Sequence, residues 1–180
     1  ISDSFTVTSI YDGVKRVYTM FKDEHGSPQY TLNSEENTDD ANGVTIRIPI
    51  QKHMFNSIQQ SAQKIFTYFN PKPIVTGCSD FKFKELKYSP TVRGTDWWLR
   101  EDEEYNRYSY RSTIKAIQGS IAYPIDCSAV EDVYPDIKLW GMPLDIEFPI
   151  GDLDVAMSRE ELSYDDATIK AIGEKLQEIE

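Results

Sequence analysis

An amphipathic helical pattern divides this chain into two parts. Between residues 53 and 69, apolar side chains recur at steps of three and four residues, the period of a helix with one buried face. The members of this stripe are Phe55, Ile58, Ala62, Ile65 or Phe66, and Phe69. The run Asn70-Pro71-Lys72-Pro73 ends the pattern, because proline cannot continue the helical hydrogen-bond ladder. We therefore predict a connecting helix over residues 51–70, with one domain over residues 1–50 and another over residues 71–180.

Residues 1–50 have the pattern of a β-meander. Strands are predicted over residues 4–10 and 14–21, joined at Asp12-Gly13, because this dipeptide is a strong signal for a tight hairpin. The rest of this part is predicted as a short strand over residues 29–33, a polar acidic loop over 34–42 and a fourth strand over 44–50.

Residues 71–180 combine further strands with a final helix. Strands are predicted over residues 73–76 and 81–88, and a hairpin over 114–125 that turns at Gln118-Gly119. A half-exposed strand is predicted where Leu144, Ile146 and Phe148 alternate with Asp145 and Glu147. A final helix is predicted from Ile169, Ile172, Leu176 and Ile179, with Ser163 as its cap. Strands followed by a helix, twice along the chain, predict an α+β fold in two layers.

Arg159 is the strongest candidate for a functional residue. Leu153, Val155 and Met157 alternate as in a strand, and Ser158 stands three residues ahead of Glu161 in a capping-box pattern that predicts a helix from Arg159. The first turn of a helix has unpaired N–H groups, so an arginine there suits a phosphate group. The alternative is an ordinary ion pair of Arg159 with a nearby carboxylate. The available carboxylates are those of Asp152, Asp154 and Glu160.

Composition excludes several classes of function. The net charge of −11 argues against a nucleic-acid-binding surface, because phosphate contacts need clustered lysine and arginine. No apolar run approaches the roughly 20 residues needed to span a bilayer. Cys78 and Cys127 fit no metal-ligand spacing, and His25 and His53 are too few for a histidine-rich metal site. We therefore expect no metal site, no nucleic-acid partner and a cytoplasmic location.

Three segments resemble a known family. Ser158-Arg159-Glu160, after Gly151-Asp152-Leu153-Asp154-Val155, is similar to the middle domain of the ninety-kilodalton heat-shock chaperones, which belong to the GHKL ATPases with gyrase and MutL. The closer resemblance is to the RIIA rapid-lysis proteins of T-even-like bacteriophages. It is carried by residues 4–10, by 119–126 and by the stretch from Phe148 through Thr168.

The resemblance implies a fold and a role for each part. Residues 1–50 would be the last strands of a GHKL ATPase sheet, and residues 71–180 a two-layer transducer-like domain of the ribosomal-protein-like β-α type. Arg159 would reach the γ-phosphate of ATP. Where the family carries Gly-Thr on the adenine side, this sequence has Gly43-Val44-Thr45, so Thr45 is the weaker candidate for nucleotide contact.

The resemblance also implies cofactors and partners. ATP and Mg²⁺ would bind the full-length protein, whose N-terminal ATPase region would be the main partner. This chain lacks the metal-holding helix, the Asp-x-Gly-x-Gly loop and the glycine-rich lid, so it is expected to be an inactive fragment without a cofactor. A homodimer through an exposed sheet edge, a host or phage protein partner and peripheral contact with the host inner membrane are further expectations. The associated functions would be lysis timing and protection against exclusion.

An aromatic segment supports other hypotheses. Its aromatic members are Tyr88, Trp97, Trp98, Tyr105, Tyr108 and Tyr110, and they are interleaved with Arg93, Arg100, Arg107 and Arg111. The acidic run Glu101-Asp102-Glu103-Glu104 would repel a phosphate backbone, so core packing or a contact patch for a partner protein is the better interpretation. The alternative function is thus a non-catalytic interaction domain. A third hypothesis is a carbohydrate-binding module that uses Trp97 and Trp98.

Overall fold

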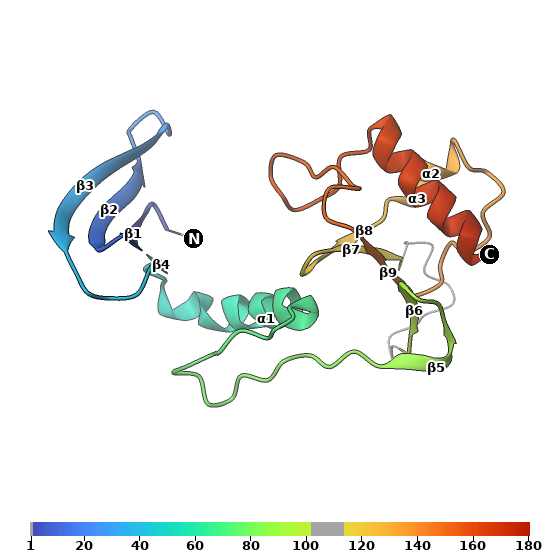
Figure 1. Ribbon diagram of the computed structural model, residues 1–180, viewed down its shortest axis with the longest axis horizontal. Coiled ribbons are helices and arrows are strands. Elements are labelled where there is room, and N and C mark those ends of the chain that lie inside the picture. The colour runs from blue at the N-terminus through green and yellow to red at the C-terminus, as the bar shows by residue number, and fades with distance from the viewer. Residues whose placement is uncertain (1, 102–113) are drawn as a thin grey trace. The chain divides into compact units, whose positions relative to one another are not determined.

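The protein has an α+β architecture in two compact units. The computed structural model describes residues 2–101 and 114–180, and it divides at Ile58 into units Ile1–Ile58 and Gln59–Glu180 (Figure 1). The first unit is built on a four-stranded antiparallel sheet, and the second on a five-stranded mixed sheet with short helices. The predicted α+β class is confirmed.

The four-stranded sheet is formed by consecutive hairpins. Its strands are β1 (Ser4–Tyr11), β2 (Val14–Lys22), β3 (Pro28–Asn37) and β4 (Gly43–Arg47), in the order β3-β2-β1-β4. Asp12 and Gly13 adopt φ values of 50° and 73°, the left-handed conformation that a tight hairpin turn requires. The predicted hairpin is confirmed.

Strand β3 is longer, and β4 shorter, than predicted. Cross-strand ion pairs extend β3 into the segment predicted as loop: Lys15 Nζ lies 2.9 Å from Glu36 Oε1, and Arg16 Nε 2.7 Å from Glu35 Oε2. These pairs join opposite charges on neighbouring strands, an arrangement that stabilises a sheet. Strand β4 ends at Arg47, shortly before Pro49, which has no N–H to donate to a ladder.

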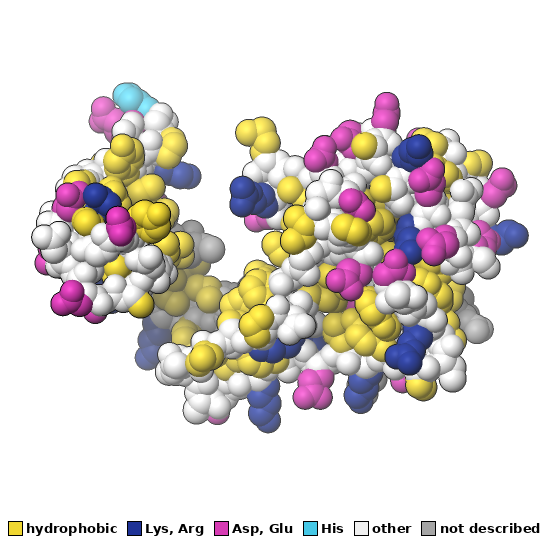
Figure 2. All heavy atoms as spheres, in the orientation of Figure 1, with side chains coloured by type: hydrophobic (Ala, Val, Ile, Leu, Met, Phe, Trp, Pro, Cys, Tyr) yellow, Lys and Arg dark blue, Asp and Glu magenta, His cyan; other side chains and the backbone are white. Residues whose placement is uncertain are grey.

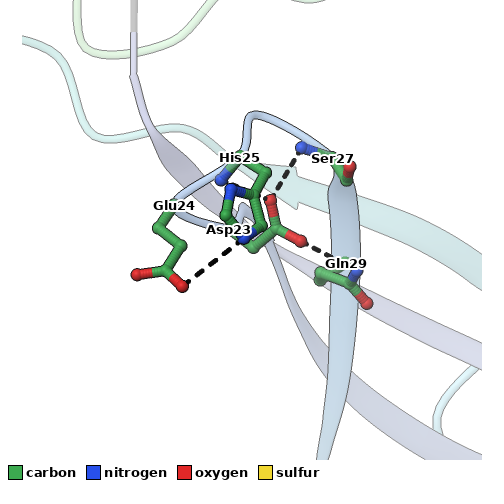
Figure 3. Close-up of polar contacts among 5 residues, drawn as sticks. All are labelled: Asp23, Glu24, His25, Ser27 and Gln29. Carbon is green, nitrogen blue, oxygen red and sulfur yellow. Dashed lines mark hydrogen bonds and ion pairs between the residues drawn. The ribbon is translucent and has the colours of Figure 1, made fainter.

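Asp23 organises the turn between β2 and β3 (Figure 3). Its Oδ1 accepts hydrogen bonds from the backbone N–H groups of Ser27, at 2.8 Å, and His25, at 3.0 Å. The hydrogen bond from Ser27 is the main cause that lowers the pKa of Asp23, and Gln29 contributes through its side chain. A carboxylate thus satisfies the donors of this turn.

The two faces of the four-stranded sheet differ in polarity. Pairing across the strands places apolar side chains on one face: Phe5, Val7, Tyr18, Met20, Tyr30, Leu32, Val44 and Ile46. The other face carries Thr6, Thr8, Thr19, Thr31 and Thr45, together with Ile10, Val17 and Phe21. No residue from 2 to 58 is buried, and apolar side chains reach the surface of this unit (Figure 2). The apolar face is therefore not buried by the described residues of its own unit.

A helical segment follows the first sheet, as predicted. It consists of a 3₁₀ turn (Lys52–Met54), helix α1 (Phe55–Ile65) and a second 3₁₀ turn (Phe66–Tyr68). The strands predicted over residues 73–76 and 81–88 are wrong, since ladder pairing begins only at Tyr88. Phe81 and Phe83 instead pack against Phe66, with ring centroids 6.5 Å from it in both cases. Their apolar side chains serve aromatic packing and not a sheet.

The second unit contains the hydrophobic core. Its strands are β5 (Tyr88–Arg93), β6 (Trp97–Arg100), β7 (Lys115–Gln118), β8 (Ile121–Pro124) and β9 (Leu144–Phe148). Their order is β5-β6-β9-β7-β8, and the β7–β9 pair is parallel. Helix α3 (Asp166–Ile179) packs on one face of this sheet and helix α2 (Cys127–Glu131) contacts α3 (Figure 1). Buried residues of β9 and α3 form the centre of the core: Leu144, Ile146, Phe148, Ile172 and Leu176.

Strand β9 is central and not half-exposed as predicted. It lies between β6 and β7 in the sheet. On the face opposite the core, Asp145 has 0 % of its surface exposed, whereas Glu147 is exposed.

The predicted hairpin over residues 114–125 is confirmed as β7–β8, with Gly119 at φ 66° in the turn.

Candidate functional site

Arg159 lies in a turn and not at the start of a helix. Residues 151–165 contain no helix and no regular strand, so both elements predicted there are wrong. The pattern Ser158–Glu161 instead forms a local turn, in which the N–H of Glu160 donates to Ser158 Oγ at 3.4 Å. The N–H of Arg159 donates to the carbonyl of Ala156 at 2.8 Å, and Arg159 itself has φ 60°.

A later cap determines where α3 begins. Asp165 Oδ1 accepts from the N–H of Thr168 at 2.8 Å, so the helix starts at Asp166. The predicted cap Ser163 is wrong: its N–H donates to the carbonyl of Asp154 at 2.8 Å and closes the loop instead. Pairing of Val155 with Leu162 holds the two sides of this loop together.

The base of the Arg159 loop is tied to the core of the second unit. Gln118 of β7 forms two hydrogen bonds with the backbone of Leu153, at 3.0 and 3.1 Å. Thr168 Oγ1 accepts from the N–H of Asp154 at 2.9 Å. Leu153 and Leu162 are buried, with 2 % and 4 % of their surface exposed. The loop therefore has a firm base and an exposed tip.

A pair of carboxyl groups lies at this base. Asp154 and Asp165 are hydrogen-bonded to each other, and this bond, followed by the negative charge of Asp165, raises the pKa of Asp154. The backbone hydrogen bond from Thr168 is the main cause that lowers the pKa of Asp165. Asp165 is thus the charged cap of α3, and Asp154 the member of the pair that holds a proton more readily.

The side chain of Arg159 is exposed and unpaired. Within the described ranges, no carboxylate lies at ion-pair distance from its guanidinium, so the ion pairs with Asp152, Asp154 and Glu160 that the sequence also allowed do not form. The fold thus presents one unneutralised guanidinium at the tip of the loop.

Thr45 lies on the threonine-rich face of the first sheet. It pairs with Thr8 of β1, while its neighbours Val44 and Ile46 point to the apolar face. Thr45 belongs to the first unit and Arg159 to the second.

The predicted aromatic segment is distributed over two faces of the second sheet. Trp97 packs against the hydrophobic core, whereas Tyr88 and Trp98 lie on the opposite face with ring centroids 6.0 Å apart. Tyr105, Tyr108, Tyr110, Arg107 and Arg111 lie outside the described residues. Core packing therefore holds for Trp97, and the contact patch for a partner protein stays a prediction for Tyr88 and Trp98.

Sequence reasoning missed a buried polar cluster centred on Asp145. Its Oδ1 lies 3.0 Å from Arg100 Nε and 3.4 Å from the hydroxyl of Tyr68, and its Oδ2 accepts from the hydroxyl of Tyr88 at 2.8 Å. Lys115 donates to the hydroxyl of Tyr68 at 3.1 Å. These partners come from positions 68 to 145, so no local pattern could have revealed them.

The pKa values of two groups in this cluster, Asp145 and Tyr88, are both raised. Burial raises the pKa of Asp145, and the positive charge of Arg100 opposes this shift without cancelling it. Burial, then the negative charge of Asp145, raises the pKa of Tyr88 far above its usual value. Tyr88 is therefore held as a neutral hydroxyl that donates to the carboxylate.

The described residues contain no metal site and no membrane-spanning helix. No group of three or more histidine, cysteine, aspartate or glutamate side chains among them could hold a metal ion. Nor is any helix in residues 2–101 and 114–180 long and apolar enough to cross a bilayer.

Comparison with known protein families gave no match, and neither did comparison with curated proteins. The resemblance to the RIIA and GHKL families therefore remains a prediction from the residues quoted above.

Proposed function

We propose that this chain is the nucleotide-state coupling region of an RIIA-like phage ATPase of the GHKL group. In this proposal Arg159 contacts the γ-phosphate of ATP, held with Mg²⁺ by an ATP-binding region of the full-length protein. The observation that carries the proposal is the exposed Arg159 guanidinium, which has no carboxylate partner in the described part of the chain.

The construction of the Arg159 loop supports this role. A residue that reports on a phosphate must be free to bind it and must also transmit the contact to the rest of its domain. The loop base meets the second requirement, because Gln118 and Thr168 join it to β7 and α3. A guanidinium has a planar fork of donors that suits phosphate oxygens.

The exposed apolar face of the first sheet supports the proposed partner. Val44 and Ile46 on this face have 69 % and 58 % of their surface exposed. Exposed apolar patches of this kind commonly mark protein contacts. In the proposal, this sheet is the end of a larger ATPase sheet, and the ATP-binding region covers its apolar face. Thr45 is then the secondary candidate on the adenine side.

The biological setting of the proposal comes from the resemblance alone. It places the protein in lysis timing or in protection against exclusion, in the host cytoplasm and at the periphery of the inner membrane.

The test compares ATP hydrolysis by the full-length protein and its Arg159→Ala variant. We expect kcat to fall by roughly a hundredfold with little change in the Kd for ATP, because the arginine acts on charge that develops during phosphoryl transfer. Arg93→Ala, which removes an exposed arginine of β5, is the matched control and should leave kcat unchanged. Absence of ATP binding to the full-length protein in calorimetry would refute the proposal.

The second candidate is a non-catalytic interaction domain. It is favoured by Tyr88 and Trp98, which lie on the sheet face opposite the core and not within it. Under this candidate, the full-length protein neither binds ATP nor responds to Arg159→Ala.

A further inference from the structure

An aromatic groove lies on the second sheet, on the face opposite the core. Its volume is about 420 Å³, within the range of about 300–1,000 Å³ that ligand sites occupy. The lining residues that matter for its chemistry are Tyr68, Phe69, Tyr88, Trp98, Ile117 and Glu147. All of them belong to the unit Gln59–Glu180.

The buried carboxylate of Asp145 holds the aromatic walls in place. Tyr88 donates to one of its oxygens at 2.8 Å, and Tyr68 to the other at 3.4 Å. The ring of Trp98 lies against that of Tyr88 at an interplanar angle of 43°. The rings of Tyr68 and Tyr88 are anchored through their hydroxyl groups, so they lose little further conformational freedom when a ligand binds. This pre-organisation favours affinity.

One carboxylate of the groove, that of Glu147, has no ion-pair partner among the described residues. Asp145 already has Arg100 as its counter-charge, but Glu147, two residues further along the same face of β9, is exposed. In the described part of the chain, no cationic side chain forms an ion pair with Glu147, and the groove lining contains no lysine or arginine.

Two lysines of the second unit have partners of their own, and one of these partners lines the groove. Lys72 donates to the backbone carbonyl groups of Phe66 and Thr67. Lys115 donates to the hydroxyl of Tyr68, with its ammonium 5.3 Å from that ring. This last contact shows that the ring of Tyr68, which lines the groove, already attracts a cation.

We propose that this groove binds the side chain of an arginine on a partner protein. Aromatic faces attract cations, most strongly where water is excluded, and guanidinium groups stack on them more often than ammonium groups do. Glu147 supplies the carboxylate that fixes the orientation of the guanidinium. The net charge of −11 also favours a basic partner segment over an acidic one. This inference does not depend on ATP or on Arg159.

The test uses the 180-residue chain and a blocked Gly-Arg-Gly tripeptide, followed by NMR. We expect chemical-shift changes at the indole of Trp98 and the amide of Glu147, saturating in the millimolar range. The same tripeptide with citrulline, which is neutral and nearly isosteric, should produce no saturable change. Equal binding of the two peptides overturns the proposal.

Two variants locate the binding. Glu147→Gln should weaken the arginine peptide at least fivefold, whereas Glu131→Gln, which removes an exposed carboxylate at the end of α2, should leave its affinity unchanged. Trp98→Leu should abolish the saturable shifts, and Trp98→Phe, which keeps an aromatic face, should retain part of the affinity. Equal effects of the two glutamate variants would show nonspecific charge attraction and overturn the proposal. Saturable shifts at Trp98 with a neutral oligosaccharide, in place of the arginine peptide, would assign the groove to sugars and also overturn it.

Discussion

At the residue scale, we expect the burial of Tyr88 beside Asp145 to make the second unit sensitive to alkaline pH. The pKa of Tyr88 is raised in the folded protein, so in the unfolded chain this tyrosine ionises first, near its usual pKa of about 10. Above that pH the unfolded state binds fewer protons than the folded state, and the free energy of unfolding must fall as pH rises. The contribution of Tyr88 is complete below its usual pKa of about 10 and is lost progressively as the pH rises from there towards the raised pKa of the folded state.

We expect Tyr88→Phe to make this alkaline decline shallower. The variant should also be less stable at neutral pH by about 1–3 kcal/mol, because Asp145 loses a hydrogen bond while buried. Urea unfolding followed by tryptophan fluorescence reports on this unit alone, since Trp97, Trp98 and Trp140 all lie in Gln59–Glu180. Tyr11→Phe, at an exposed ring of β1, is the control. If the free energy of unfolding of Tyr88→Phe fell as steeply with rising pH as that of the parent protein, Tyr88 would not be the group responsible.

At the scale of the element, Gly173 in α3 is required by packing and not by helix formation. At an interior position of a helix, alanine is more stable than glycine by about 1 kcal/mol in helix propensity. However, a Cβ at position 173 would lie 2.2 Å from Cε2 of Tyr134 and 2.3 Å from its Cδ2. The ring of Tyr134 packs against the core, so it must be displaced.

We therefore expect Gly173→Ala to lower the free energy of unfolding by about 1–3 kcal/mol, against its helix propensity. Gln177→Ala, at an exposed position of the same helix, should change it by no more than about 0.5 kcal/mol. In the double variant with Tyr134→Leu, the penalty of Gly173→Ala should largely disappear if the clash is its cause. If Gly173→Ala alone raised the free energy of unfolding, the ring of Tyr134 would have moved aside without loss of stability, which would contradict the prediction.

At the scale of the whole molecule, the two units should differ widely in local stability. Residues 2–58 include no buried residue, whereas the second unit buries a core that includes Ile114, Ile146 and Leu176 with 0 % exposure. Local opening requires less free energy where few apolar contacts are lost. We expect amides of β1–β4 to exchange with deuterium at least roughly a hundredfold faster than those of β7, β9 and α3.

Hydrogen exchange followed by mass spectrometry checks this difference directly. Equal protection of the two sheets at low protein concentration would contradict it. Protection of β4 that increases with protein concentration would instead indicate pairing of its free edge with another copy, as the sequence led us to expect.

Local patterns in the sequence were sufficient for the elements that depend on neighbouring residues. The hairpin at Asp12-Gly13, the hairpin at Gln118-Gly119 and the helical segment Lys52–Tyr68 all form as predicted. Turn residues and helical spacing act over a few positions, so they can be interpreted without knowledge of the fold. The α+β class follows from the order of these elements.

Only the tertiary structure decided the features that depend on distant partners. Asp145 has the alternation of an exposed strand residue, yet it is buried because the side chains of Arg100, Tyr88 and Tyr68 lie against its carboxylate. Ser158 has the pattern of a helix cap, yet it lies in a turn because Val155 pairs with Leu162 and Asp165 provides the cap of α3. Periodicity records which residues share a face, but not what covers that face. Which of two possible cap residues begins a helix is decided by tertiary packing, and a short sequence pattern carries no information about that packing.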